Sequence, residues 1–299
     1  MVVGAGVIGL SVAVRLLEAG HRVDVLARDL PLETTSSVAA AIWYPYLALP
    51  REKVTAWGKA TYDELARLAA EGVDGVTMRH GTELLHQPTP DPWWIGAVPA
   101  LARVAPRPPY ADAWFFTAPV VDMPRYLTWL TERVRDAGGT VTRMALARLP
   151  DAPLVVNCSG IGSRVLASDL STRPVRGQVV VVEQVGLEEW WLAEGAAGGV
   201  PTYVIPRTTE IVLGGTDDEG DWSRSPAPDT AADIVRRAAE LVPELARAKI
   251  LRHKVGLRPA RPEVRLERVG NVIHCYGHGG SGVTLSWGCA DEVAALVNR

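Results

Sequence analysis

The chain is poor in cysteine and phenylalanine and has no long apolar run. Its 299 residues contain three cysteines and two phenylalanines, against ten tryptophans. The cysteines, Cys158, Cys275 and Cys289, lie far apart in the sequence without metal-site spacing. This pattern excludes a disulfide-rich secreted scaffold and favours a reducing compartment. No apolar run reaches the ~18 residues of a membrane span, and the chain starts directly with a strand pattern. We therefore expect a cytoplasmic protein.

Neither sign of charge dominates the chain. Lys and Arg number 31 and Asp and Glu number 34, which gives a net charge of −3, and the basic residues are scattered. This distribution argues against nucleic acid and anionic membranes as partners. A hydrophobic content of 47% is enough for a sizeable core, in one large domain or two joined ones. We expect a small molecule as the partner and, by default for an enzyme, a homodimer.

A glycine-rich turn follows the first short strand of the sequence. Val2 and Val3 precede Gly-Ala-Gly-Val-Ile-Gly at 4–9, and an apolar helix pattern follows. In this G-x-G-x-x-G setting Gly4 permits a tight turn, Gly6 lets backbone amides approach a pyrophosphate, and Gly9 lets helix and strand pack closely. The helix N-terminus adds unpaired donors and a partial positive charge. The pattern predicts a dinucleotide site, although similar turns also close phosphate-free units.

The end of the second predicted strand, 21–27, leaves the choice of dinucleotide open. Asp29 lies about 20 residues after the glycines, where an acid binds ribose hydroxyls. Arg28 precedes it, and an arginine there either favours the 2′-phosphate of NADP or covers the adenosine. Four hydroxyl residues follow at 34–37, before small residues at 38–41. They either cap a helix formed by the alanine run or contact phosphate and a flat ring.

The rest of the chain mixes two kinds of pattern. Helices are predicted at 50–70, 125–134 and 230–240, and parallel-type strands at 140–144 and 154–157. Short apolar runs with proline-rich turns between 76 and 116, and a hairpin of 202–207 with 210–216, indicate antiparallel sheet. The fold class is α/β (α+β): a Rossmann-like nucleotide-binding domain with an interleaved, mixed or antiparallel substrate domain.

Two stretches near the carboxyl end carry candidate functional residues. Arg258 stands in Gly-Leu-Arg-Pro between apolar residues and turn prolines, so it is either part of a solvated turn or a partly buried arginine that needs a carboxylate. The segment 272–290 reads as strand, glycine turn and helix, without the Lys of a phosphate loop. His274 and His278 are four apart, but the glycines exclude a helical zinc pair and no Cys or carboxylate completes a ligand set. We expect no metal.

The segments 4–9, 38–43, 256–259 and 276–284 together resemble the D-amino-acid oxidase family of FAD flavoproteins, in collinear order over essentially the whole chain. The resemblance implies non-covalently bound FAD. It also implies a discontinuous FAD-binding domain, formed by 1–75, 140–172 and 268–299, and a substrate-binding and interface domain, formed by 76–139 and 173–267.

The resemblance also implies roles for individual residues. Arg258 matches the arginine that binds the substrate α-carboxylate, Tyr203 a tyrosine that hydrogen-bonds the same group, and Gly280 the residue whose carbonyl accepts from the amine. The implied FAD contacts are Gly4, Ala5, Gly6, Val7, Ile8, Gly9, Arg28, Asp29, Thr34, Thr35, Ser36, Ser37, Ala41, Ile42, Gly279, Gly280, Ser281, Gly282, Val283 and Thr284.

The implied reaction is oxidative deamination of D-amino acids to 2-oxo acids, ammonia and H₂O₂, by hydride transfer from the α-carbon to flavin N5. No acid, Lys or free His is evident as a base, and a neutral amine requires none. The alternatives are a glycine or sarcosine oxidase, a D-aspartate oxidase using Arg207 or Arg261, and a silent FAD- or NADP-binding module.

Three positions depart from the family pattern. A second tyrosine is replaced by Gly199 in the pair 198–199, a flavin-side glycine by Ala41, and a pocket glutamine by Tyr44. These changes leave the preferred substrate side chain open.

Overall fold

A computed structural model of the protein describes residues 1–195 and 199–298. Within that part of the chain, all strands belong to one sheet in the order β4-β5-β3-β9-β10-β11-β8-β13-β14-β7-β1-β2-β6, with β12 paired to β8. The strands are β1 Val2–Val3, β2 Asp24–Ala27, β3 Val76–Leu85, β4 Leu101–Arg103, β5 Asp112–Val121, β6 Thr140–Arg143, β7 Val155–Asn157, β8 Arg173–Glu183, β9 Trp190–Ala193, β10 Thr202–Pro206, β11 Glu210–Gly214, β12 Asp218–Glu219, β13 Ile250–Val269 and β14 Val272–His278. The helices are α1 Val7–Glu18, α2 Arg51–Ala70, α3 Met123–Asp136, α4 Ser163–Leu166, α5 Pro228–Leu241 and α6 Gly282–Val297.

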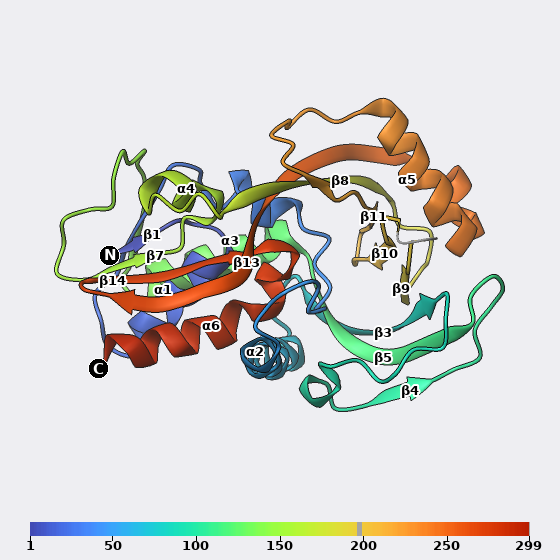
Figure 1. Cartoon of the computed structure of the whole chain (residues 1–299), viewed down its shortest axis with the longest axis horizontal. Coiled ribbons are helices and arrows are strands. Elements are labelled where there is room, and N and C mark those ends of the chain that lie inside the picture. Colours follow the sequence, from blue (N-terminus) through green and yellow to red (C-terminus); the bar gives the residue numbers. More distant parts are fainter. Residues whose placement is uncertain (196–198, 299) are drawn as a thin grey trace.

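One end of the sheet is a parallel nucleotide-binding unit (Figure 1). β1 lies between β2 and β7, and β6 and β14 extend the parallel set on either side. Helix α1 packs against both α3 and α6. Because ligands bind at the carboxyl ends of such strands, the turns after β1 and β14 meet at one edge.

The other end of the sheet is mainly antiparallel and is connected to the first by two long strands, β8 and β13 (Figure 1). The first half of β13 pairs with β8 and its second half with β14. The interpretation of the segment around Arg258 as a solvated turn is wrong, because Pro259 lies inside β13 opposite Pro174. Pro262 is tolerated because the pairing of β13 with β14 is irregular between Ala260 and Arg265.

The predicted helices and the predicted hairpin are present with small differences in their bounds. β10 and β11 pair antiparallel, with Tyr203 opposite Gly214. One open alternative is excluded, since the alanine run 39–41 forms no helix: Thr35–Val38 is a short 3-10 turn, and Ala41 has a positive φ of 61°. The fold class is confirmed as a mixed α/β structure, while the division into two discontinuous domains stays a prediction.

The core consists of separate hydrophobic clusters that differ in character between the two ends of the sheet. Aliphatic side chains of α1, α3 and α6 fill the nucleotide-binding end. Aromatic side chains fill the space between α2 and the antiparallel strands, including the fully buried Trp43 and Trp190. Among the described helices, none is both long and apolar enough to cross a bilayer.

Candidate active site

A cavity of about 1230 Å³ extends from the glycine turn after β1 to the inner strands of the antiparallel sheet. Its walls come from segments that are distant in the sequence, among them Gly6, Ser36, Glu83, Tyr203 and Arg258. The cavity therefore joins the predicted dinucleotide site to the predicted carboxylate-binding arginine.

The glycine turn has the tight geometry that its sequence predicts. Gly4 has a φ of 113°, and a Cβ at Gly9 would overlap the carbonyl oxygen of Gly4. Gly6, Val7 and Ile8 line the cavity where α1 begins, and the first turn of α1 carries no acidic side chain. A Cβ at Gly6 would lie 3.0 Å from the hydroxyl oxygen of Ser36. The turn is therefore a cradle of backbone donors that fits a pyrophosphate.

The four hydroxyl residues of 34–37 differ in their roles. Ser36 Oγ accepts a hydrogen bond from the backbone N–H of Val7 at 3.0 Å, so this serine caps α1 rather than an alanine helix. Thr35 donates to the carbonyl of Leu257 at 3.1 Å, which connects this turn to the strand of Arg258. Thr34, Thr35 and Ser36 line the cavity, whereas Ser37 is buried beneath it and donates to Thr34.

Arg28 and Asp29 lie at the outer part of the cavity. Their side chains form an ion pair at 2.6 Å, and Arg28 is 59% exposed. The hydrogen bond from Arg28 lowers the pKa of Asp29, and the charge of Arg224 adds to the effect. Arg224 also lines the cavity and was not singled out from the sequence. Its position depends on a loop far from the glycine turn, so no local pattern indicates it.

The second glycine turn, after β14, divides into lining and supporting residues. Gly279, Gly280, Gly282 and Val283 line the cavity, as do Ala41 and Ile42 opposite them. Ser281 and Thr284 are buried, and their hydroxyls instead bind the 44–46 segment. Ser281 donates to the carbonyl of Tyr46 at 2.7 Å, and Thr284 bonds both backbone groups of Tyr44. These two residues position the tyrosines of the cavity wall.

Arg258 is a partly buried arginine with its side chain 21% exposed. Its Nη1 donates to the carbonyl of Thr216 at 2.8 Å and lies 3.4 Å from Asp217 Oδ1. The guanidinium lies across β8 at Gly177, where a Cβ would be only 2.5 Å from Nη2. An arginine held in this way presents its remaining donors to a planar carboxylate.

Two tyrosines flank Arg258. Burial raises the pKa of the Tyr203 phenol, while the neighbouring Arg258 opposes this effect. The Tyr203 ring packs on Gly214 and Gly215, where any side chain would overlap it. Tyr46 donates to Asp217 Oδ2 at 3.2 Å, and burial together with Asp217 raises the pKa of Tyr46 to about 12. Tyr203 and Arg258 therefore lie side by side, and their role in carboxylate binding stays a prediction.

The sequence indicated only Asp29 as an acid of the cavity, but Asp217 and Glu83 line it as well. Glu83 on β3 accepts a hydrogen bond from the Tyr44 hydroxyl at 2.8 Å. Burial raises the pKa of Glu83 to about 7 against the lowering effect of this bond, and the charge of Glu194 adds to the rise. The pairing of β3 with β9 places Glu83 next to Leu192, another residue of the cavity wall, so no sequence pattern near Glu83 points to this position.

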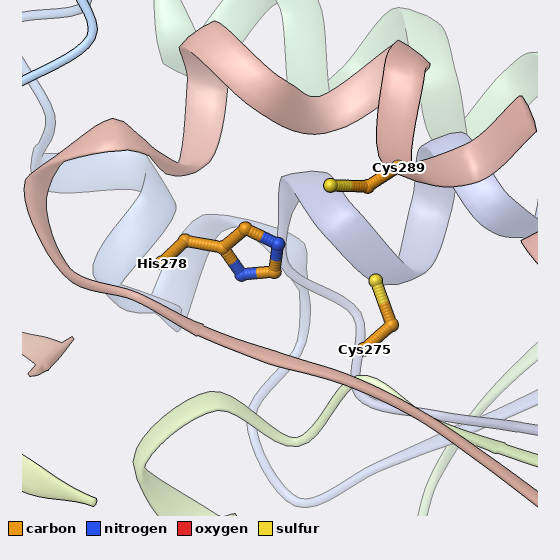
Figure 2. A group of neighbouring side chains, drawn as sticks. All are labelled: Cys275, His278 and Cys289. Atoms are coloured by element: carbon orange, nitrogen blue, oxygen red, sulfur yellow. The ribbon is translucent and has the colours of Figure 1, made fainter. Parts of the chain in front are cut away.

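The cysteines are close together in space, contrary to their wide spacing in the sequence. Cys275, His278 and Cys289 have ligand-type atoms within 4.8 Å of one another, and all three are buried (Figure 2). The expectation that no Cys completes a set around His278 is therefore wrong, because β14 and α6 pack against each other. Burial raises the pKa of the Cys289 thiol well above its ordinary value, so this thiol is neutral. The expectation that the protein binds no metal stays a prediction.

Together, the glycine cradle, the long cavity and the arginine at its inner end fit an enzyme that binds a dinucleotide next to a carboxylate-bearing molecule. The family model described as FAD dependent oxidoreductase (DAO) matches residues 1–296. The chain belongs to this DAO family of FAD-dependent oxidoreductases, and FAD is its cofactor. The family resemblance and the cofactor predicted from the sequence are thus confirmed.

Full-length relatives carry more specific names. A D-amino-acid oxidase of Rubrobacter xylanophilus is 48% identical over 99% of this chain and 94% of that protein. A D-amino-acid oxidase of Streptomyces coelicolor is 46% identical over 100% of this chain and 96% of that protein. The human D-aspartate oxidase is 38% identical over 100% of this chain and 94% of that protein. Among solved structures, a glycine oxidase from Geobacillus kaustophilus has a TM-score of 0.84 at 21% identity, covering 100% of this chain and 94% of its own, which supports the fold alone.

Proposed function

We propose that the protein oxidises free D-amino acids to 2-oxo acids, with O₂ as the final electron acceptor. The observation that carries the proposal is Arg258, which lies with Tyr203 at the inner end of the cofactor cavity. The two D-amino-acid oxidases at 46–48% identity over nearly the full chain support the same reaction.

The residues of the chain act by positioning the substrate. Arg258 binds the α-carboxylate through donors that Thr216 and Asp217 leave free, and the Tyr203 hydroxyl donates to the same carboxylate. The carbonyl of Gly280 accepts from the neutral amine. Bound FAD supplies the two-electron acceptor for the C–H bond of the substrate, and its reoxidation by O₂ yields H₂O₂. These three contacts supply much of the rate enhancement, because they hold the reacting C–H bond of the substrate in the geometry that the reaction needs.

The alternative of a D-aspartate oxidase has less support from the geometry. A second substrate carboxylate would need a second cation, and the sequence offers Arg207 and Arg261 for this role. Arg207 is bound to Glu210 and to the carbonyl of Ala39, and Arg261 to Asp169. Neither arginine lines the cavity. The alternative of a glycine or sarcosine oxidase rests on likeness of fold alone.

The test is a peroxide assay of the FAD-loaded protein with D-alanine, L-alanine, D-aspartate, glycine and sarcosine. We expect D-alanine to give the highest kcat/KM of the five. Higher activity on sarcosine or D-aspartate would reject the proposal in favour of that alternative, and no peroxide from any of them would favour a silent FAD-binding module. The cytoplasmic location stays a prediction from composition, and the homodimer stays a prediction from the general preference of enzymes; light scattering of the purified protein tests the homodimer.

A further inference from the structure

Glu83 is a buried carboxyl whose hydrogen bonds are incomplete. The residue is 8% exposed and lines the cavity. Its Oε1 accepts from Tyr44, whereas Oε2 has no partner among the described residues. A glutamine would accept the same bond from Tyr44 without a titrating group, so orienting Tyr44 does not explain an acid here. A buried polar oxygen without a donor is costly, and the cost falls when a ligand supplies the donor.

The sheet register places Glu83 at a defined distance from the carboxylate-binding residues. Glu83 pairs with Leu192 of β9, and Leu192 pairs with Tyr203 of β10. Paired residues project from the same face of a sheet, so Glu83 and Tyr203 lie about 10 Å apart, two strand spacings. A substrate with its carboxylate at Tyr203 and Arg258 extends toward Glu83 only if its side chain is long.

The neighbouring charge that acts on Glu83 is that of a second acid, Glu194. Glu194, just after β9, also lines the cavity and accepts from the backbone N–H of His86 at 3.0 Å. Arg258 binds the α-carboxylate end, and Arg224 acts on Asp29 at the other end of the cavity. The three residues outside the described part, 196–198, are Ala-Ala-Gly and carry no charged side chain. The carboxyl and imidazole groups that line this part of the cavity are thus Glu83, Glu194 and His86, and of the described arginines and lysines only Arg28, Arg224 and Arg258 line the cavity at all.

Aromatic side chains line the same part of the cavity. Tyr44, Trp93 and Trp94 contribute to the wall, and the rings of Tyr44 and Trp94 meet edge to face with centroids 5.4 Å apart. Aromatic faces stabilise cations and also pack against methylene groups. Gly195 and Gly199 also line the cavity, and a Cβ at Gly195 would overlap the Gly199 carbonyl, so a glycine is needed there for the close approach of the two backbone segments.

We propose that Glu83, with Glu194 and the aromatic wall, forms a subsite for the cationic side chain of a long D-amino acid such as D-lysine or D-arginine. This inference rests on the proposed oxidation of D-amino acids and specifies the class of side chain. A cation next to Glu83 favours its charged form, so the preference for cationic substrates rises with pH through the range in which Glu83 loses its proton. An acidic side chain is repelled by the same groups.

The experiment compares kcat/KM for D-lysine, D-norleucine and D-glutamate at several pH values. D-Norleucine has the chain length of D-lysine without its charge. We expect D-lysine to exceed D-norleucine at least tenfold at pH 8, this ratio to fall toward pH 6, and D-glutamate to be poorest. Glu83→Gln should lower the ratio about tenfold, and the matched Glu52→Gln, at an exposed site on α2, should leave it as in the unchanged protein. A ratio near one, or a ratio that Glu83→Gln does not change, would overturn the inference.

Two further measurements separate the possible failures. If D-alanine and D-methionine also give no peroxide, the proposed function fails; if they react and D-lysine is not preferred, only the subsite inference fails. Tyr44→Phe is a second variant, for the case that Glu83→Gln does not fold. It keeps the Glu83 carboxyl but removes the hydrogen bond from Tyr44 that lowers the pKa of Glu83. We expect Tyr44→Phe to shift the rise of the D-lysine ratio to higher pH, and an unshifted profile would contradict the role of Glu83.

Discussion

Gly177→Ala tests whether the position of the Arg258 guanidinium, and not just its presence, determines activity. A Cβ at Gly177 would lie 2.5 Å from Nη2 and 2.6 Å from Cζ of Arg258, so the guanidinium must move by about 1 Å to reach ordinary contact. The displaced atoms are the end of a flexible side chain, and alanine is preferred over glycine in a strand, so stability should change little. A misplacement of ~1 Å in a substrate-positioning group costs roughly 10²-fold in rate, or about 2.7 kcal/mol.

The assay is kcat/KM for D-alanine with FAD content and Tm measured on the same samples. We expect a loss of roughly tenfold to a hundredfold, with FAD bound and Tm within a few degrees of the unchanged protein. Gly96→Ala is the matched control, because a Cβ there meets no atom within 4 Å. Activity within threefold of the unchanged protein would refute the reasoning, and so would a loss of activity that follows a large loss of Tm.

Two further predictions concern cofactor binding and pH. Gly6→Val places branched methyl groups where the Cβ alone is 3.0 Å from Ser36 Oγ, so the purified protein should lack the flavin absorbance; FAD at normal stoichiometry would contradict the cradle. Glu83→Gln should raise Tm relative to the unchanged protein at pH 8.5 and much less at pH 5. The folded chain keeps the proton on Glu83 up to about pH 7, whereas the unfolded chain loses it near 4.5, so stability falls as pH rises across this window. An equal Tm difference at both pH values would contradict the raised pKa.

The parts of the fold that the sequence predicts are those specified by local patterns. The turn 4–9 needs glycine because Gly4 has a positive φ and Gly9 touches the preceding turn. The hairpin of β10 and β11 follows from two apolar runs around a short connection. Arg258 and Tyr203 came from a family resemblance, and their proximity in the fold agrees with it.

The parts that the sequence does not predict depend on which strands become neighbours. Glu83 lies in the cavity because β3 pairs with β9, and Cys289 approaches Cys275 because α6 packs on β14. Gly177 has an ordinary strand conformation, and its need for glycine comes from an arginine 81 positions later in the chain. Local periodicity contains no information on such long-range pairings.

The hydroxyl segment 34–37 shows how context decides between two local interpretations. Its residues fit the cap of a helix, and Ser36 does act as a cap, but of α1 rather than of the residues that follow it. The positive φ of Ala41 and the short 3-10 turn before it end any helix there.

The central claim is that Arg258 binds the α-carboxylate of a D-amino acid and that FAD binding in the same cavity does not require Arg258. The most direct measurement is kcat/KM for D-alanine by FAD-loaded Arg258→Leu, with FAD content as the control. Loss of a paired, partly buried charge costs about 3–5 kcal/mol, so we predict at least a hundredfold loss with FAD still bound. Near-normal turnover of D-alanine by this variant would contradict the claim.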